Sequence, residues 1–320
     1  METYDIDTDA VQRAPEEPPR KRRLWLWILL VLLVAGALGF GGYLVFGEMQ
    51  AQQAASDDID AASRLLESAD AIVIEVDEVV RAEIDAELGV RAQDLRGELP
   101  AALDDLSAAI ALVDGALDEL PGADVPYARA LKASAEPRIE MLELADGLLA
   151  ANVKAAAALD PSIEAWDLVL EAEAISDQAV AKYNELEKES VTESVELSTK
   201  AEELIGRANE LFSEAATGFP EADFSDYLSY CEGKLEMLAL SKKADESWLA
   251  GKIEEANETI SQYNEKETAV IELAKTLPDS PVEAVAVAYE ALADDDTTSY
   301  FDARQNATQA DAALQEFGGV

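Results

Sequence analysis

Carboxylates are the only chemically versatile side chains that this sequence holds in abundance. The 320 residues include 67 Asp and Glu against 24 Lys and Arg, with one cysteine and no histidine, for a net charge of −43. The lack of histidine removes the commonest general base and metal ligand, so Ser-His-Asp triads and Cys/His zinc sites are excluded. A carboxylate-based hydrolase is the remaining enzymatic alternative, but carboxylate pairs arise by chance at this density. We therefore predict a protein that is not an enzyme and needs no cofactor.

Two acidic stretches have features of calcium sites. In "DIDTDAVQRAPE" (5–16), acids stand at positions 1, 3, 5 and 12 of an EF-hand-like loop, but Ala10 replaces the glycine that the turn needs. We therefore interpret this stretch as part of a disordered tail. The densest acidic patch, "ADDDTTS" (293–299), could bind calcium or a basic partner. We favour a solvated turn that caps the last helix.

The single cysteine and two tryptophans are interpreted as packing residues. Cys231 stands between Tyr230 and Glu232, without the cationic neighbours that activate a thiol, so we predict a small buried hydrophobe. Trp166 and Trp248 lie in patterns with helical spacing, where aromatic residues pack against a core.

One apolar segment predicts a membrane anchor. Leu24–Phe46 has no charged residue, and as a helix of about 35 Å it would cross a hydrocarbon core of about 30 Å. Trp25, Trp27 and Tyr43 stand at its ends, where membrane interfaces favour aromatic residues. Cations flank only its N-terminal end: Arg20, Lys21, Arg22 and Arg23. The positive-inside rule then predicts a cytoplasmic N-terminus and an extracytoplasmic part from Gly47 to Val320.

A cleaved signal peptide is the alternative for this segment. Ala35-Gly36-Ala37 could form a cleavage site, but nine more uncharged residues follow it, which favours an uncleaved signal anchor. Small residues four apart, Ala35/Gly39 and Ala37/Gly41, would allow two such helices to pair, so a homo-oligomer is possible.

The acidity lies almost entirely beyond the apolar segment. Residues 47–320 hold 61 of the carboxylates and 19 of the cations, a net charge of −42. Such a surface excludes nucleic acid as a partner, because phosphate binding needs a basic face. It favours another envelope protein with a basic or apolar surface, although adaptation to high salt would produce the same charge.

Apolar residues in this acidic part recur with helical spacing. Ile59, Ala62, Leu66, Ala69, Val73, Val76 and Val80 step by three and four, widened by Leu65, Ile72 and Val79. A second seam comprises Leu103, Leu106, Ile110, Val113, Leu117 and Leu120. Helical seams without strand-like alternation predict an all-α fold: a single N-terminal transmembrane helix followed by an elongated antiparallel bundle or stacked helical hairpins.

Stop and start signals divide the chain further. We expect the first two helices to join near Gly89–Pro100, and new helices to open after Asp124 and Asp160, each close to a proline. A face of Ile163, Trp166, Leu170 and Ala174 follows, and a last short pair spans 282–292 and 300–317, for eight or nine helices beyond the membrane segment. The predicted divisions are a disordered cytoplasmic tail (1–23), a transmembrane helix (24–46), a membrane-proximal hairpin (47–123) and a helical-hairpin domain (124–320).

Short matches suggest a duplicated unit of about a hundred residues. "LPGADV" (120–125) matches "FPEADF" (219–224), and "RIEML" (138–142) matches "KLEML" (234–238). On a shorter scale, "SWLAGK" (247–252) matches "SYFDAR" (299–304), each placed where one helix would pass to the next. With Gly251 and Ala256, residues 224–317 loosely resemble tetratricopeptide-type hairpins, without their 34-residue period. The resemblance implies stacked hairpins that bind peptides or proteins.

Together these patterns predict a membrane-anchored extracytoplasmic interaction module or scaffold. The alternative is a ligand or cation sensor that signals through the single membrane helix. The short N-terminal tail, which has no room for a catalytic output domain, favours the scaffold.

Overall fold

A computed structural model describes the backbone of residues 21–318 and the side chains of residues 47–317. This part of the chain contains seven helices and no strand, so the all-α prediction is confirmed. The helices are α1 (Lys21–Val80), α2 (Ala86–Ala116), α3 (Val125–Tyr183), α4 (Lys188–Gly218), α5 (Ser225–Leu249), α6 (Ile253–Ala274) and α7 (Pro281–Gly318).

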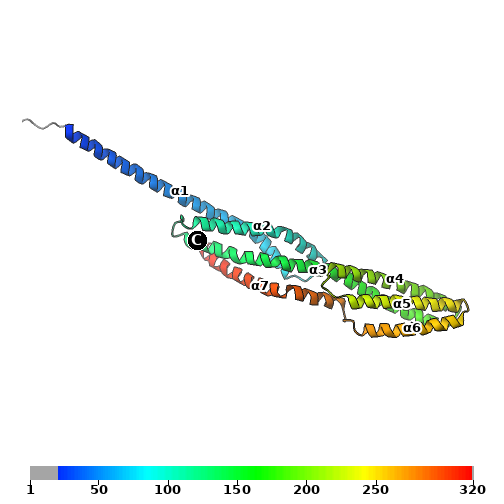
Figure 1. The fold of residues 1–320 in the computed structure, drawn as a ribbon. Coiled ribbons are helices and arrows are strands. Elements are labelled where there is room, and N and C mark those ends of the chain that lie inside the picture. Colours follow the sequence, from blue (N-terminus) through cyan, green and yellow to red (C-terminus); the bar gives the residue numbers. More distant parts are fainter. Residues whose placement is uncertain (1–20, 319–320) are drawn as a thin grey trace, which may run out of the picture.

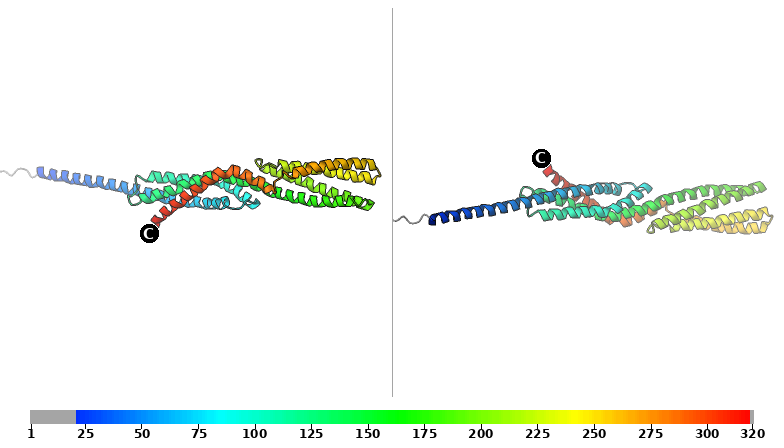
Figure 2. Two further views of the ribbon diagram at one scale, coloured as in Figure 1. Left: turned by 90° about the horizontal axis from the view of Figure 1, so that it is seen from below. Right: turned by 90° about the horizontal axis from the view of Figure 1, so that it is seen from above.

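The helices form two bundles arranged end to end and joined by the long helix α3 (Figures 1 and 2). The proximal bundle contains the C-terminal part of α1, α2, the first half of α3, and α7. The distal bundle contains the second half of α3 with α4, α5 and α6. Helix α7 runs back from the distal bundle along α3, so the chain ends beside the proximal bundle.

The two bundles repeat one plan, as the short sequence matches suggested. Helices α2 and α4 are each 31 residues long, and they begin at Ala86 and Lys188, 102 positions apart. Helices α3 and α5 begin at Val125 and Ser225, 100 positions apart. The "LPGADV" and "FPEADF" matches end where these two helices begin, so each marks the same step of the plan.

The predicted seams form most of the proximal core. Ile59, Ala62, Leu66, Ala69, Val73 and Val76 of α1 are buried, although the last step of the seam is Val79 rather than Val80. In the distal core, aromatic rings fill the space near the start of α5, and the Phe212 and Tyr227 rings stack with their centroids 5.0 Å apart. Burial of these apolar faces provides the main free energy that holds helices of this length together.

The predicted join near Gly89–Pro100 is wrong. The turn spans residues 81–85, and the Asp85 carboxylate caps α2 by accepting a hydrogen bond from the Leu88 N–H at 2.7 Å. Gly89 lies inside α2 because α2 and α3 approach closely there: a Cβ on Gly89 would lie 2.5 Å from the Ala156 Cβ. The glycine therefore serves helix packing rather than helix termination.

Two further predicted breaks are also absent, so the expected eight or nine helices are too many for residues 21–318. Pro161 lies inside α3, which continues past Asp160 to Tyr183, and the predicted pair at 282–292 and 300–317 is one helix, α7. A proline removes one backbone hydrogen bond, here at the Ala157 carbonyl. Gly218 packs close to that carbonyl, where the two bundles meet. Tertiary packing on both sides thus offsets the cost of the proline.

The predicted inner face of the second half of α3 is also wrong. Ile163 and Leu170 are 39% and 53% exposed, whereas the buried face holds Ala165, Val169, Ala172 and Ile175. Alanine-rich helices offer several faces with apolar spacing, and the small side chains permit closer packing, which decides which face is buried.

The hairpin expected from the "SWLAGK" match is confirmed, but its counterpart is not. Residues 250–252 form the turn between α5 and α6, where Gly251 adopts a positive φ of 77°. "SYFDAR" lies within α7 instead of at a turn between two helices. Helix α7 then leaves α6 and packs along α3, so the stack of hairpins implied by the tetratricopeptide resemblance does not continue.

The predicted membrane segment, Leu24–Phe46, lies outside the residues whose side chains are described, and so do Trp25, Trp27, Tyr43 and the flanking cations. The predicted tail up to residue 20 lies outside the description altogether. Among the described residues, no helix has an apolar stretch long enough to cross a membrane. The predicted boundary between 123 and 124 coincides with the loop before α3, and α3 packs against α1 and α2 before it enters the distal bundle.

Candidate functional site

Each bundle has one seam at which two neighbouring helices do not pack directly against each other. In the proximal bundle this seam lies between α1 and α7, and in the distal bundle it lies between α3 and α6. A buried cation lies at each seam: Arg138 of α3 and Lys234 of α5. These are the first residues of the matching "RIEML" and "KLEML" segments, so each bundle carries a buried cation on the third of its four helices.

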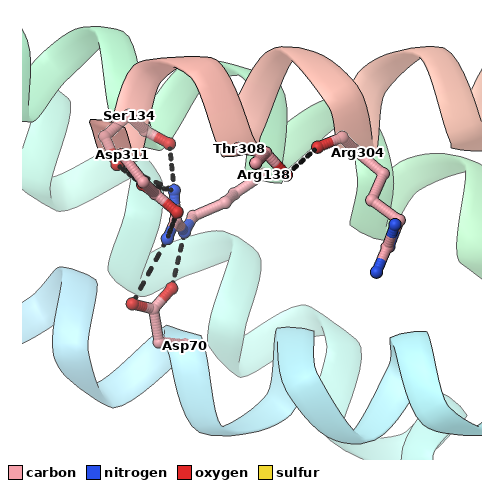
Figure 3. A network of polar contacts seen from close by, with 6 residues as sticks. All are labelled: Asp70, Ser134, Arg138, Arg304, Thr308 and Asp311. Carbon is pink, nitrogen blue, oxygen red and sulfur yellow. Dashed lines mark hydrogen bonds and ion pairs between the residues drawn. The ribbon is translucent and has the colours of Figure 1, made fainter. Parts of the chain in front are cut away.

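At the proximal seam, Arg138 connects three helices (Figure 3). Its Nε donates to Asp70 Oδ1 of α1 at 2.5 Å, and its Nη1 and Nη2 donate to the Asp311 carboxylate of α7 at 2.8 and 3.0 Å. Nη1 also donates to the Ser134 carbonyl at 2.8 Å. Burial alone would lower the pKa of Arg138, but the hydrogen bonds to Asp311 and Asp70 outweigh it and raise that pKa. The guanidinium therefore stays charged and fully paired.

The groove around this network has a volume of about 340 Å³ and carries further ion pairs. The Asp77 carboxylate of α1 forms two ion pairs. Its Oδ1 lies 2.6 Å from the Arg304 Nε of α7, and its Oδ2 lies 3.0 Å from the Arg81 Nη2. Since these arginines are all paired with carboxylates inside the groove, the arrangement connects α7 to α1 and leaves no cation ready to bind an anion. We interpret the proximal seam as a structural clamp.

At the distal seam, the cation has a simpler partner set. The Lys234 Nζ lies 2.6 Å from Glu173 Oε1 of α3, and the Tyr230 hydroxyl donates to the same oxygen at 2.5 Å. Burial, followed by the hydrogen bond to Glu173, raises the pKa of Tyr230, so its hydroxyl stays protonated. No residue of α6 takes part in this pair, so α6 has no equivalent of the clamp on α7.

Further along the distal seam lies a cavity of about 130 Å³ with a buried acid. It is lined by Val180, Tyr183, Asn184, Ser241, Ala244, Asp245, Ile260, Tyr263 and Asn264. Asp245 is only 2% exposed, and its Oδ2 has no hydrogen-bond partner. Burial is the main cause that raises the pKa of Asp245 to about 6.

A third concave surface lies where the two bundles meet, and we call it the junction groove. Its volume is about 360 Å³, and it is lined by Glu221, Asp223, Asp226, Tyr227, Pro278, Glu283, Ala284, Val287, Ala288 and Ala291. Val287 in its lining is 62% exposed. Burial first, then the carboxylates of Glu283, Asp226 and Asp279, raises the pKa of Tyr227 to about 12. The lining therefore combines apolar side chains with negatively charged ones.

The residues singled out in the sequence occupy varied positions. Cys231 is fully buried, and burial raises the pKa of its thiol to about 12, which confirms the packing prediction. Trp166 packs edge-on against Tyr227 at 5.5 Å, whereas Trp248 is only half-buried near the end of α5. The "ADDDTTS" patch is not a turn but the middle of α7, where Asp294 and Asp295 face solvent.

Within residues 47–317, no group of three or more acidic or thiol side chains is placed to hold a metal ion. The sequence patterns predicted neither the clamp nor the cavity. The "RIEML" and "KLEML" match was a usable signal for Arg138 and Lys234, because a charged residue recurring inside an apolar stripe must find a partner. Asp245 has no such signal, since it lies among charged neighbours in "SKKADESW".

The chain matches no protein-family model, and comparison with curated proteins and with solved structures gave no match either.

Proposed function

We propose that this chain is a membrane-anchored, non-enzymatic helical interaction module with its N-terminus in the cytoplasm and its bundles outside. Helix α1 supports this arrangement, because one continuous helix from Lys21 to Val80 includes both the apolar stretch and the first buried seam. The bundles then extend in tandem from the end of that helix (Figure 1). Such a module would hold a binding surface at a set distance from the membrane.

The junction groove is the observation that carries the proposal. Its lining includes the exposed Val287 and four carboxylates: Glu221, Asp223, Asp226 and Glu283. Of these, Glu221 is paired with Lys154 at 2.5 Å. A groove that combines exposed apolar and acidic side chains is complementary to an amphipathic segment with basic residues. The proposed partner is therefore an envelope protein that presents a basic, amphipathic helix.

The charge of the module determines how this partner would bind. Attraction between exposed charges is screened beyond about 8 Å at physiological ionic strength, so salt should reduce the association rate. The apolar side chains of the groove should instead determine the dissociation rate, because contacts with them are formed only after docking.

A matched pair of variants tests this proposal. The full chain and the variants Val287→Asp and Val90→Asp are used to capture proteins from envelope extract at low and high salt. Val287 lies in the junction groove, whereas Val90 lies on α2 and is 63% exposed, so both changes add one charge to an exposed apolar position. A basic partner retained by wild type and Val90→Asp but lost by Val287→Asp supports the proposal. Capture that is equal for all three, or insensitive to salt, contradicts it.

The orientation is tested separately. A reporter that is active only in the cytoplasm should stay silent when fused after Val320, and replacing Arg20, Lys21, Arg22 and Arg23 with neutral residues should weaken that orientation. Reporter activity from the unmodified chain would show that the bundles lie in the cytoplasm.

A ligand sensor is the second candidate function, and the distal cavity favours it. Asp245 offers a buried acceptor without a partner in an acidic, cation-attracting part of the chain. Helix α3 runs from this cavity to the clamp on α1, which would provide a mechanical route toward the membrane segment.

A further inference from the structure

We propose that the cavity between α3, α5 and α6 binds a small organic cation, a primary or quaternary ammonium compound with about six non-hydrogen atoms. The size follows from the cavity volume of about 130 Å³, because an engineered cavity of about 150 Å³ accommodates benzene. This inference goes beyond the interaction module and does not rest on the junction groove.

The unpaired carboxylate is the first reason for a positively charged ligand. A buried polar atom without a partner is costly, and ionised oxygens in protein interiors are normally paired or hydrogen-bonded. Asp245 Oδ2 has no such partner although the side chain is almost fully buried. A bound ammonium ion would supply the missing positive charge, and a primary ammonium ion would also supply N–H donors to Oδ2.

The basic side chains closest to the cavity along α3 and α5 do not neutralise Asp245: Lys243 is exposed, and the other two pair with other carboxylates. Lys242 of α5 pairs with Glu202 of α4, and Lys182 of α3 pairs with Glu193 of α4 at 3.0 Å. Both pairs lie with α4, on the opposite side of the bundle from α6. The protein therefore does not use these lysines to neutralise Asp245.

The remaining walls suit an organic cation. Tyr183 and Tyr263 line the cavity together with the aliphatic side chains of Val180 and Ile260. Aromatic rings attract ammonium groups through their quadrupole, most strongly in desolvated sites. The hydroxyl of Ser241 and the side-chain amides of Asn184 and Asn264 add polar groups that could orient a substituent on the ligand.

A divalent metal ion fits the cavity less well. Calcium takes six to eight oxygen ligands and magnesium requires octahedral coordination, usually with more than one carboxylate. Asp245 is the only carboxylate in the lining, and the described residues contain no acidic cluster suited to a metal. An alkylammonium ion needs one counter-ion and an apolar enclosure, which this cavity provides.

The binding experiment uses the full chain in a maltoside detergent, because phosphocholine detergents themselves carry a quaternary ammonium group. Tetramethylammonium chloride and pentylammonium chloride, with five and six heavy atoms in their cations, are titrated by calorimetry, and thermal unfolding is followed in parallel. tert-Butanol, with the same number of heavy atoms as tetramethylammonium, is the neutral control. Sodium chloride at equal ionic strength is the second control, because any salt screens a chain with a net charge of −43. At least one ammonium ion should bind, whereas neither control should.

Two variants assign the binding to the cavity. Asp245→Asn keeps the shape of the side chain and should weaken ammonium binding at least tenfold, whereas Glu246→Gln, an exposed neighbour, should bind like wild type. If Asp245→Asn proves to be misfolded by circular dichroism, Ile260→Trp keeps the carboxylate and fills the cavity, and it should abolish binding too. Binding that survives both changes overturns the proposal, and so does an ammonium response no larger than that of sodium chloride.

The pH dependence gives a second readout. Ammonium affinity should rise between pH 5 and about 7.5, because Asp245 must lose its proton to pair with the ligand. The groups that face it are Tyr183 of α3, Tyr263 of α6 and the Ser194 hydroxyl of α4, while the exposed Glu246 of α5 contributes only charge repulsion from outside the cavity. Burial raises the pKa of both tyrosines, so they stay neutral throughout this range. Wild-type affinity that is flat over this range contradicts a role for Asp245.

Discussion

The proximal and distal bundles share one plan of four helices but treat the charge at their open seams differently. In the proximal bundle, Arg138 is paired with carboxylates from two other helices, Asp70 of α1 and Asp311 of α7. In the distal bundle, Lys234 pairs with Glu173 of α3 alone, and the buried Asp245 is left without a partner for Oδ2. Ion pairs thus connect the helices on either side of the proximal seam, whereas the distal seam contains a buried carboxylate oxygen without a hydrogen-bond partner.

The helices that complete the two bundles also differ in origin. Helix α6 follows α5 directly through the turn at Gly251, so the distal bundle is completed by local contacts. Helix α7 returns to the proximal bundle from the far end of the chain, and Asp311 lies 173 residues from its partner Arg138. Bringing distant segments together costs more loop entropy, and a directional, charge-assisted clamp helps specify where α7 docks. The comparison shows that two bundles with the same order of helices can pair their buried charges in different ways. In the proximal bundle the pairing connects a distant helix, and in the distal bundle it leaves one carboxylate oxygen unpaired.

The largest expected effect comes from breaking the clamp. Arg138→Met should lower the free energy of unfolding by about 3–5 kcal/mol, because it leaves two carboxylates without their buried partner. Arg138→Lys should recover only part of the loss, since lysine lacks the planar fork that reaches both acids. Chemical denaturation measures the stability, and hydrogen exchange should show increased exchange in α7. An unchanged exchange rate in α7 would show that the clamp does not hold this helix.

Removing the charge of Asp245 in the distal bundle should raise the free energy of unfolding, the opposite of the effect expected at Arg138. The pKa of Asp245 is raised from 3.8 to about 6, so the folded state favours the protonated acid, and stability falls as the pH rises through this window. Asp245→Asn should therefore raise the free energy of unfolding above pH 6 by at most about 3 kcal/mol and have little effect near pH 4. Urea denaturation of wild type and Asp245→Asn at several pH values measures the difference in the free energy of unfolding. A loss of stability at pH 8 would mean that the carboxylate is needed by the fold.

The distal ion pair should matter less than the proximal clamp. Lys234→Met should cost about 1–3 kcal/mol, the usual cost of removing one hydrogen-bonded partner, because Tyr230 still donates to Glu173. Hydrogen exchange should locate the loss in α5 and the second half of α3, which this pair joins, with α7 unaffected. If Lys234→Met destabilised the chain as much as Arg138→Met, the contrast between the two seams would not hold.

The smallest effects concern two glycines of one helix. Gly89→Ala should destabilise by about 1–3 kcal/mol, because the added Cβ would meet Ala156 at 2.5 Å where the bundles join. Gly97→Ala, at an exposed position of α2 with open space around it, should stabilise by about 0.5–1 kcal/mol. Thermal unfolding of the two variants provides the comparison. Equal effects would show that the approach of α2 to α3 is not as close as described.

Much of the helical architecture followed from the sequence alone. The steps of three and four residues from Ile59 to Val76 predicted both the helix and its buried face, because a stripe with this period can be buried only by helical packing. The "LPGADV" and "FPEADF" matches lie at the same step of both bundles, where each ends at the start of a helix, because proline and aspartate are common just before or within the first turn. These features depend on local backbone preferences and on periodicity, which a sequence displays directly.

Tertiary structure decided where helices continue and which charges are buried. Pro161 and Gly89 have the local character of helix breaks, yet packing where the two bundles meet keeps both inside helices. Nothing in the sequence distinguishes Asp311 from Asp245 among the 67 carboxylates. In the folded chain, Asp311 accepts hydrogen bonds from Arg138, whereas Asp245 Oδ2 has no hydrogen-bond partner. The physical reason is that local preferences amount to about 1 kcal/mol for glycine and about 3 kcal/mol for proline, which the burial of neighbouring helices can offset. The pairing of a charge depends on groups from distant helices, which come together only when the chain has folded.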